Sequence, residues 1–246
     1  MIPHLLLSAL LVAGLACDGD ALGPLPAGGR RVLFIGNSLT YENDLPRTIA
    51  DLARSLDETP LVYRTIAKPN YALEDHWNDG VATRIAADGW QLVVMQQGPS
   101  SLPQNQEFLR SWTVQLNSAI TAAGARSALY MVWPAMQNFS TFDGVRTSYR
   151  NAAIAVNGLF IPAGEAWRTA WAADSSLSLY ADDLLHPSRL GTYLAALVHF
   201  EMLYDRPATD LPDVAVVNGR RLDVPAQTVA LLQQAAHGTV LAWGIR

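Results

Sequence analysis

Short apolar runs alternate with longer amphipathic stretches along most of this chain. Five runs have the length of buried strands and lie at residues 32–35, 61–66, 92–95, 128–132 and 159–161. Six stretches have the apolar spacing of helices and lie at residues 45–56, 77–87, 106–123, 145–156, 189–203 and 226–237. A strand followed by a helix, repeated along the chain, predicts right-handed βαβ units. We therefore expect an α/β fold with a mostly parallel five-stranded sheet covered by helices on both faces.

A single domain is expected over residues 31–246. The chain has 246 residues, enough for one large domain with a sizeable core, and shows no internal repeat. Residues 205–225 are Pro-rich and irregular, and Val217-Asn218-Gly219-Arg220 has the sequence of a tight hairpin turn. We interpret this segment as an excursion within the domain.

The composition is that of a globular protein without a nucleic-acid partner. Hydrophobic residues make up 50% of the chain and charged residues 16%, which is too apolar and too weakly charged for disorder. The formal net charge is −5 and no basic run occurs. The charge balance therefore predicts that the chain does not bind nucleic acid.

The N-terminus has the features of an export signal. Residues 5–16 are almost wholly apolar, which suits a signal-peptide core and is too short to span a bilayer, and His4 is the only candidate for a positive charge before them. We expect residues 1–16 to be a signal peptide and residues 17–30, rich in Gly, Ala and Pro, to be a tether. The protein is therefore expected to be exported, to the periplasm, the extracellular space or the bacterial envelope.

Cys17 is the sole cysteine, so no disulfide can form within the chain. It stands where bacterial lipoproteins carry their lipidated cysteine, although Gly14 occupies a position that is usually Leu. Membrane anchoring through a lipidated Cys17 is expected, and a plain cleaved signal with an incidental cysteine is the alternative.

A serine stands where the first predicted strand ends. Residues 32–35 lead directly into Gly36-Asn37-Ser38, and the carboxyl ends of strands in open α/β sheets carry ligands and chemistry. Far downstream, Asp183 and His186 stand three residues apart, before Pro187. A neutral imidazole can take the proton of a serine hydroxyl, and a carboxylate can orient that imidazole.

Each of these motifs alone has an ordinary explanation. Gly-Asn-Ser also fits a plain polar turn, and Asp-x-x-His also fits a helix N-cap beside a surface histidine. Their combination predicts a triad of Ser38, His186 and Asp183, with Asp182 as the alternative acid.

The two segments resemble sequence blocks of the GDSL/SGNH hydrolase superfamily. Gly36-Asn37-Ser38-Leu39 resembles its nucleophile block, with Asn in place of the usual Asp, and Asp183-Leu184-Leu185-His186-Pro187 resembles its terminal Asp-x-x-His block. The blocks occur in the family order, and the resemblance spans roughly residues 31–204. It implies a flavodoxin-like three-layer α/β/α sandwich and hydrolysis of ester bonds. The chain has no Gly-x-Ser-x-Gly elbow, which would have indicated the α/β-hydrolase fold.

The resemblance also implies an oxyanion hole, whose donors depart from the usual pattern. The family uses the serine N–H, the N–H of a second-block glycine and the side-chain amide of a third-block asparagine. In this chain the second block falls at residues 68–76 and the third at residues 93–100. Asn70 stands at the glycine position, where asparagine tolerates a positive φ, and Ala72 is the alternative donor. The third block has no Gly-x-Asn-Asp and carries two glutamines at the end of a strand. We expect Gln96 to supply the amide, with Gln97 as the alternative, while a simple polar strand end is the competing interpretation.

Further residues are candidates for the substrate pocket: Asn37, Gln97, His76 and Trp133. His76 belongs to the second block, where a structural histidine is the alternative. Trp133 follows the fourth predicted strand and forms either an apolar wall of the pocket or part of the core. Glu165 and His199 are expected to be structural.

These residues together predict an exported serine esterase that acts on a small-molecule or glycan ester. Ser38 attacks the carbonyl, His186 transfers the proton and Asp183 orients His186, with carbohydrate O-deacetylation as the expected task. No cofactor is expected, because no His/Cys cluster has metal-ligand spacing and no Gly-rich phosphate loop follows the first strand. An O-acyltransferase on the same triad and a non-enzymatic glycan-binding module are the alternatives, and the oligomeric state is left open.

Overall fold

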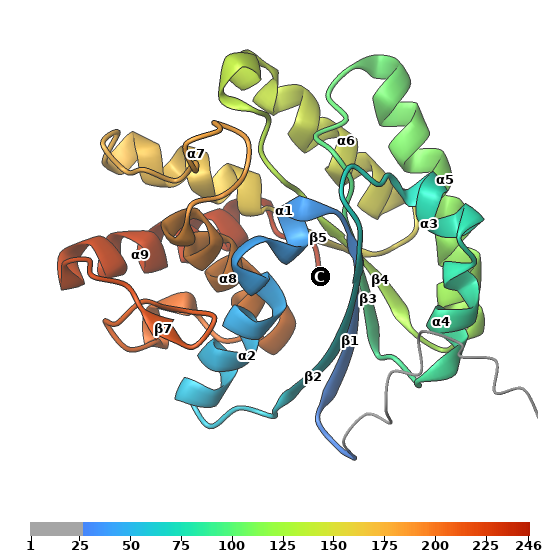
Figure 1. The fold of residues 1–246 in the computed structure, drawn as a ribbon, viewed down its shortest axis with the longest axis horizontal. Coiled ribbons are helices and arrows are strands. Elements are labelled where there is room, and N and C mark those ends of the chain that lie inside the picture. Colours follow the sequence, from blue (N-terminus) through green and yellow to red (C-terminus); the bar gives the residue numbers. More distant parts are fainter. Residues whose placement is uncertain (1–26) are drawn as a thin grey trace, which may run out of the picture.

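The computed structural model describes residues 27–246 and places a parallel sheet at the centre of the molecule (Figure 1). The strands are β1 (Arg30–Gly36), β2 (Leu61–Ala67), β3 (Leu92–Met95), β4 (Arg126–Tyr130) and β5 (Leu159–Ile161). They lie in the order β2-β1-β3-β4-β5, and each neighbouring pair is parallel. The four apolar residues at 32–35 are all fully buried, as a strand covered on both faces requires.

Helices form a layer on each face of this sheet, as Figure 1 shows. One layer contains α3 (Leu73–Asn78), α4 (Val81–Ala87), α5 (Pro103–Ala122) and α6 (Phe142–Ala155). The other contains α2 (Leu45–Ser55), α7 (Ala163–Ala173), α8 (Arg189–Tyr204) and α9 (Ala226–Trp243). The remaining helical segments are short: α1 (Ser38–Tyr41) and the 3₁₀ segments Glu42–Asp44, Met136–Thr141 and Ala208–Asp210. The predicted three-layer α/β/α sandwich is confirmed.

Two of the predicted helices differ most from their predicted extents, for local reasons, while α5 and α6 each begin three residues earlier than predicted. The stretch predicted as one helix at 77–87 is divided between α3 and α4, because Gly80 takes a left-handed φ of 78° that breaks the helix. The last helix, predicted to end at His237, continues to Trp243 because Gly238 keeps a helical conformation. One helix, α7, was not predicted, since its buried face consists mainly of alanines, which give a weaker apolar signal than larger side chains.

The predicted hairpin in the Pro-rich segment is confirmed as β6 (Val216–Val217) and β7 (Arg220–Arg221). Asn218 and Gly219 form its turn with φ of 49° and 70°, as a tight two-residue turn requires. The hairpin packs on α2, where the Asn218 N–H donates to Thr48 Oγ1. This contact brings the hairpin close to the loop that follows α1.

The predicted signal peptide, Cys17 and most of the predicted tether lie outside the described residues. They therefore stay predictions. Within residues 27–246, none of the helices has the length and apolar character needed to cross a bilayer.

Candidate active site

The turn after β1 presents Ser38 at the carboxyl edge of the sheet. Asn37 is the N-cap of α1, because its Oδ1 accepts a hydrogen bond from the Leu39 N–H at 3.1 Å, and Ser38 is the first residue of that helix. A Cβ atom at Gly36 would lie 2.5 Å from Gln96 Oε1 and would also clash with Thr40. Glycine is therefore required before the serine, because the end of β3 approaches the turn this closely.

A hydrogen-bonded chain joins Ser38 to the segment after α7. His186 Nε2 lies 2.8 Å from Ser38 Oγ, and His186 Nδ1 lies 2.5 Å from Asp183 Oδ2. The other carboxylate oxygen of Asp183 accepts hydrogen bonds from the backbone N–H groups of Leu185 at 3.0 Å and His186 at 2.9 Å. Asp182, the alternative acid, is exposed and takes no part in this chain.

The carboxyl group of Asp183 is held in its ionised form. The hydrogen bond from His186, followed by those from the Leu185 and His186 backbone, lowers the pKa of Asp183 to about 2. An ionised carboxylate against Nδ1 fixes the proton on that nitrogen and leaves Nε2 free to accept a proton from the serine hydroxyl.

Trp133 supports the loop that carries Asp183 and His186 (the histidine loop) from its core side and does not line a pocket. Its side chain is fully buried and stacks on Trp167 with ring centroids 3.5 Å apart. Its indole N–H donates to the Leu185 carbonyl at 3.0 Å, directly before His186. The expectation that Trp133 forms a wall of the pocket is wrong, because the stacked indole lies in the core beneath the loop.

The side chain of Gln96 is hydrogen-bonded to the turn that carries Ser38, and neither hydrogen of its amide is free to bind an oxyanion. Its Oε1 accepts from the Asn37 N–H at 2.9 Å and from Thr40 Oγ1 at 2.7 Å. Because the backbone N–H can only donate, this contact fixes the orientation of the amide. Both hydrogens of Nε2 are then used, by Asn37 Oδ1 at 2.9 Å and by the Gln97 carbonyl at 2.6 Å. The prediction of Gln96 as the donor is therefore wrong in this geometry.

Gln97, the alternative donor, lies in the wall of the groove beside Ser38. Its Oε1 accepts from the Leu73 N–H at 3.1 Å, and its Nε2 donates to Ser100 Oγ at 2.9 Å. One Nε2 hydrogen has no further acceptor among the described residues, which leaves Gln97 able to donate where Gln96 cannot.

Two backbone N–H groups beside the groove are also unused within residues 27–246. These are the N–H groups of Ser38 and of Asn70, both residues that line the groove. Asn70 has a φ of 61°, the left-handed conformation that its position in the second block demands. Ala72 is not equivalent, because its N–H already donates to Asp75 Oδ2 at 2.8 Å.

His76 supports the turn from behind and does not face the groove. Its Nε2–H donates to the Gly36 carbonyl at 2.7 Å, and the side chain is buried. Burial lowers the pKa of His76, which keeps the ring neutral. The structural alternative for this residue is the correct one, and its predicted place in the substrate pocket is wrong.

A groove of about 460 Å³ opens beside Ser38. It is lined by Asn37, Ser38, Leu39, Asn70, Tyr71, Ala72, Gln97, Gly98, Pro99, Ser100, Asn105, Phe108 and Leu185. Asn37 and Gln97 thus lie where the sequence placed them. None of the lining side chains carries a charge, and four of them are amides.

Asn43 is a supporting residue that the sequence did not reveal. Its side-chain amide donates to the Pro187 carbonyl at 3.0 Å and to Thr192 Oγ1 at 2.9 Å. It therefore ties the loop after Ser38 to the loop that carries His186. Pro187 lies 144 residues after Asn43 in the chain, and no local sequence pattern predicts a contact over that separation.

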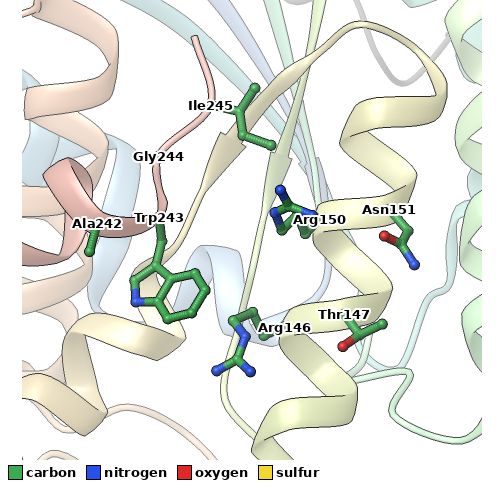
Figure 2. Close-up of a pocket in the computed structure, with 8 residues that line it drawn as sticks. All are labelled: Arg146, Thr147, Arg150, Asn151, Ala242, Trp243, Gly244 and Ile245. Atoms are coloured by element: carbon green, nitrogen blue, oxygen red, sulfur yellow. The ribbon is translucent and has the colours of Figure 1, made fainter.

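A separate cavity of about 350 Å³ lies between α6 and the C-terminal segment (Figure 2). Figure 2 shows Arg146 of α6 facing Trp243 of α9, with the guanidinium 4.5 Å from the centre of the ring. Arg146 also pairs with Asp143 and with buried Glu165, which confirms the structural role predicted for Glu165. None of the residues that bond to Ser38 or His186 lines this cavity.

No family model and no curated protein matches the chain. Solved structures do. A protein from Slackia heliotrinireducens assigned to the SGNH hydrolases is 28% identical, with a TM-score of 0.60 over 70% of this chain and 98% of that one. A DUF4886 family protein from Bacteroides uniformis is 19% identical, with a TM-score of 0.72 over 86% of this chain and 95% of that one. A lipase/acylhydrolase from Enterococcus faecalis is 13% identical, with a TM-score of 0.59 over 74% and 97%.

The fold and the similarity to an SGNH hydrolase that is 28% identical support an esterase-type hydrolase. The chain is similar in sequence and in fold to an SGNH hydrolase, which supports the resemblance to the GDSL/SGNH superfamily carried by its two sequence blocks.

Proposed function

We propose that the chain is an exported serine esterase whose triad is Ser38, His186 and Asp183. The observation that carries the proposal is the continuous hydrogen-bonded chain from Ser38 Oγ through both nitrogens of His186 to Asp183. A serine hydroxyl is a weak nucleophile unless a base within hydrogen-bond reach takes its proton, and His186 is such a base.

The reaction proceeds through an acyl-enzyme. Ser38 Oγ attacks the ester carbonyl while its proton passes to His186 Nε2. His186 returns that proton to the alcohol oxygen as its bond to the acyl carbon breaks, which leaves the acyl group on Ser38. Water then attacks the acyl-enzyme by the same route in reverse. Asp183 stabilises the imidazolium at each stage without taking the proton.

The oxyanion is held by the N–H groups of Ser38 and Asn70, with the Gln97 amide as the third donor. These are the donors beside the groove that have no other acceptor among the described residues. Losing one such donor typically costs ~10²–10³ in rate, because the charge develops where water is excluded.

The acyl group is short, and the task is O-deacetylation of a carbohydrate. The side-chain amides of Asn37, Asn70, Gln97 and Asn105 line the groove, and a long alkyl chain would strip water from them without returning hydrogen bonds. An acetyl group avoids that cost. Export, which the apolar run before residue 17 supports, brings the enzyme to glycans outside the cell.

The proposal is tested with a fluorophosphonate probe and with p-nitrophenyl acetate. Wild-type protein is expected to be labelled and to hydrolyse the acetate faster than p-nitrophenyl octanoate. Ser38→Ala abolishes labelling, and both Ser38→Ala and His186→Ala lower turnover by about 10⁶-fold. The mass of the labelled protein, expressed with its own N-terminus, reports whether residues 1–16 have been removed.

Ser100→Ala is the matched control, because Ser100 lines the same groove but does not contact His186. It is expected to keep labelling. Full turnover in both Ser38→Ala and His186→Ala would refute the assignment.

A further inference from the structure

A second hollow lies near the loop that carries His186 and shares no lining residue with the neutral groove. It has a volume of about 350 Å³ and is lined by Asn43, Arg189, Val217, Asn218 and Arg220. Asn43 donates to the Pro187 carbonyl, and Pro187 follows His186 directly. Arg189 begins α8, three residues after His186. The hollow therefore lies next to the loop that carries the histidine of the triad, between the loop after α1, the start of α8 and the β6–β7 hairpin.

Positive charge in this hollow is not neutralised by the protein. Arg189 Nη2 donates to the backbone carbonyls of Val217 at 3.2 Å and Arg220 at 3.0 Å, which fixes the guanidinium but leaves its charge uncompensated. Within residues 27–246, neither Arg189 nor Arg220 pairs with a carboxylate. Other surface arginines of the same region do, since Arg47 and Arg54 both pair with Asp51.

The acidic residues nearby either do not line the hollow or form hydrogen bonds elsewhere. Glu42 and Asp44 flank Asn43 in the chain, but neither lines the hollow. Asp44 caps α2 by accepting from the Arg47 N–H, and Asp51 Oδ2 accepts from the Gly219 N–H behind the hairpin turn. Two guanidinium groups therefore face a space whose remaining polar groups are amides, which is a setting that binds an anion.

The chemistry of the triad says which part of a substrate reaches this hollow. His186 Nε2 gives its proton to the oxygen of the leaving alcohol, so the alcohol part extends past His186 while the acyl group lies in the neutral groove. We propose that Arg189 and Arg220 bind an anionic group, a carboxylate or a phosphate, carried by the alcohol part of the substrate. The assignment to the alcohol part rests on the proposed function and names its substrate class: an acetyl ester of an acidic sugar.

Hydrolysis of two acetylated oligosaccharides tests this specificity. Wild-type protein is expected to hydrolyse acetylated oligogalacturonide with a kcat/KM about tenfold above that for acetylated xylo-oligosaccharide, the factor that one charge-assisted hydrogen bond supplies. Arg220→Gln should remove that preference, mainly by raising KM for the acidic substrate. Arg221→Gln is the matched control, because Arg221 is the next residue of the same short strand and does not line the hollow. It is expected to keep the preference.

Binding to Ser38→Ala separates this proposal from the esterase proposal. Titration calorimetry with unacetylated oligogalacturonide and with inorganic phosphate distinguishes a carboxylate site from a phosphate site. Arg220→Gln in the Ser38→Ala background should lower the affinity for the probe that binds about tenfold. Hydrolysis of p-nitrophenyl acetate without binding of either probe overturns the anion site and leaves the esterase. Binding of a probe without hydrolysis of any ester supports the anion site and overturns the esterase. Equal losses in Arg220→Gln and Arg221→Gln overturn the site in either case.

Discussion

At the scale of single residues, Gln96 has every polar atom of its side chain in a hydrogen bond although that side chain is fully buried. It joins the end of β3 to Asn37 and Thr40, which hold Ser38 between them. Gln96→Met keeps the length of the side chain but leaves the Asn37 N–H and the Thr40 hydroxyl without their acceptor. We expect the free energy of unfolding to fall by about 1–3 kcal/mol. We expect kcat for p-nitrophenyl acetate to fall by about 10²-fold with little change in KM, because Ser38 is displaced.

Gln97→Met separates positioning from oxyanion binding. Its amide has a free hydrogen at the groove, so kcat should fall while stability changes less than in Gln96→Met. Chemical denaturation and steady-state kinetics on both variants decide between the two roles. A Gln96→Met protein that keeps wild-type stability but loses kcat would return the oxyanion role to Gln96.

At the scale of elements, the segment between α7 and α8 carries Asp183 and His186 and is fastened from several sides. Trp133 donates to the Leu185 carbonyl at 3.0 Å, and Trp171 donates to the Leu177 carbonyl near the start of the same segment at 2.9 Å. Trp133→Phe and Trp171→Phe therefore each remove one N–H···O=C bond while keeping an aromatic ring. Both should lose about 1 kcal/mol of stability. Only Trp133→Phe should lower kcat, by about tenfold, because only that bond adjoins His186. Equal kcat values in the two variants would deny Trp133 a positioning role.

The same elements show which parts of the fold and of the candidate site could be predicted from the sequence. The strands were predictable because short apolar runs buried on both faces have few alternatives, and 92–95 and 159–161 coincide with β3 and β5. The proximity of Ser38, Asp183 and His186 was predictable because their types and order are those of a serine triad. The donors around them were not, because an amide becomes free or occupied only through its neighbours in space. Gln96 and Gln97 are adjacent and identical in the sequence, yet one is consumed by Asn37 and the other faces the groove.

At the scale of the whole molecule, the second helical layer packs on the sheet through α8, which begins directly after the histidine loop. His199 lies on α8, fully buried against Tyr130 of β4 with ring centroids 4.5 Å apart, which confirms that it belongs to the core. Burial lowers the pKa of His199 to about 4 from an ordinary value of 6.5. Between these two pH values the unfolded chain binds a proton that the folded protein refuses, so unfolding takes up a proton. Stability is therefore present above pH 6.5 and falls as the pH drops toward 4.

His199→Phe removes this titration and keeps a ring in the apolar site. The wild-type free energy of unfolding should fall more steeply than that of the variant between pH 6.5 and 4, by up to about 1.4 kcal/mol per pH unit, the limit for one proton. Urea titrations at several pH values across this range measure both slopes. If the slopes are identical, His199 does not couple protonation to folding. If the slopes differ, protonation of His199 in the core destabilises α8, the helix that begins after His186. Turnover of p-nitrophenyl acetate should then decline irreversibly on prolonged incubation near pH 4, and it should decline more in the wild type than in the variant.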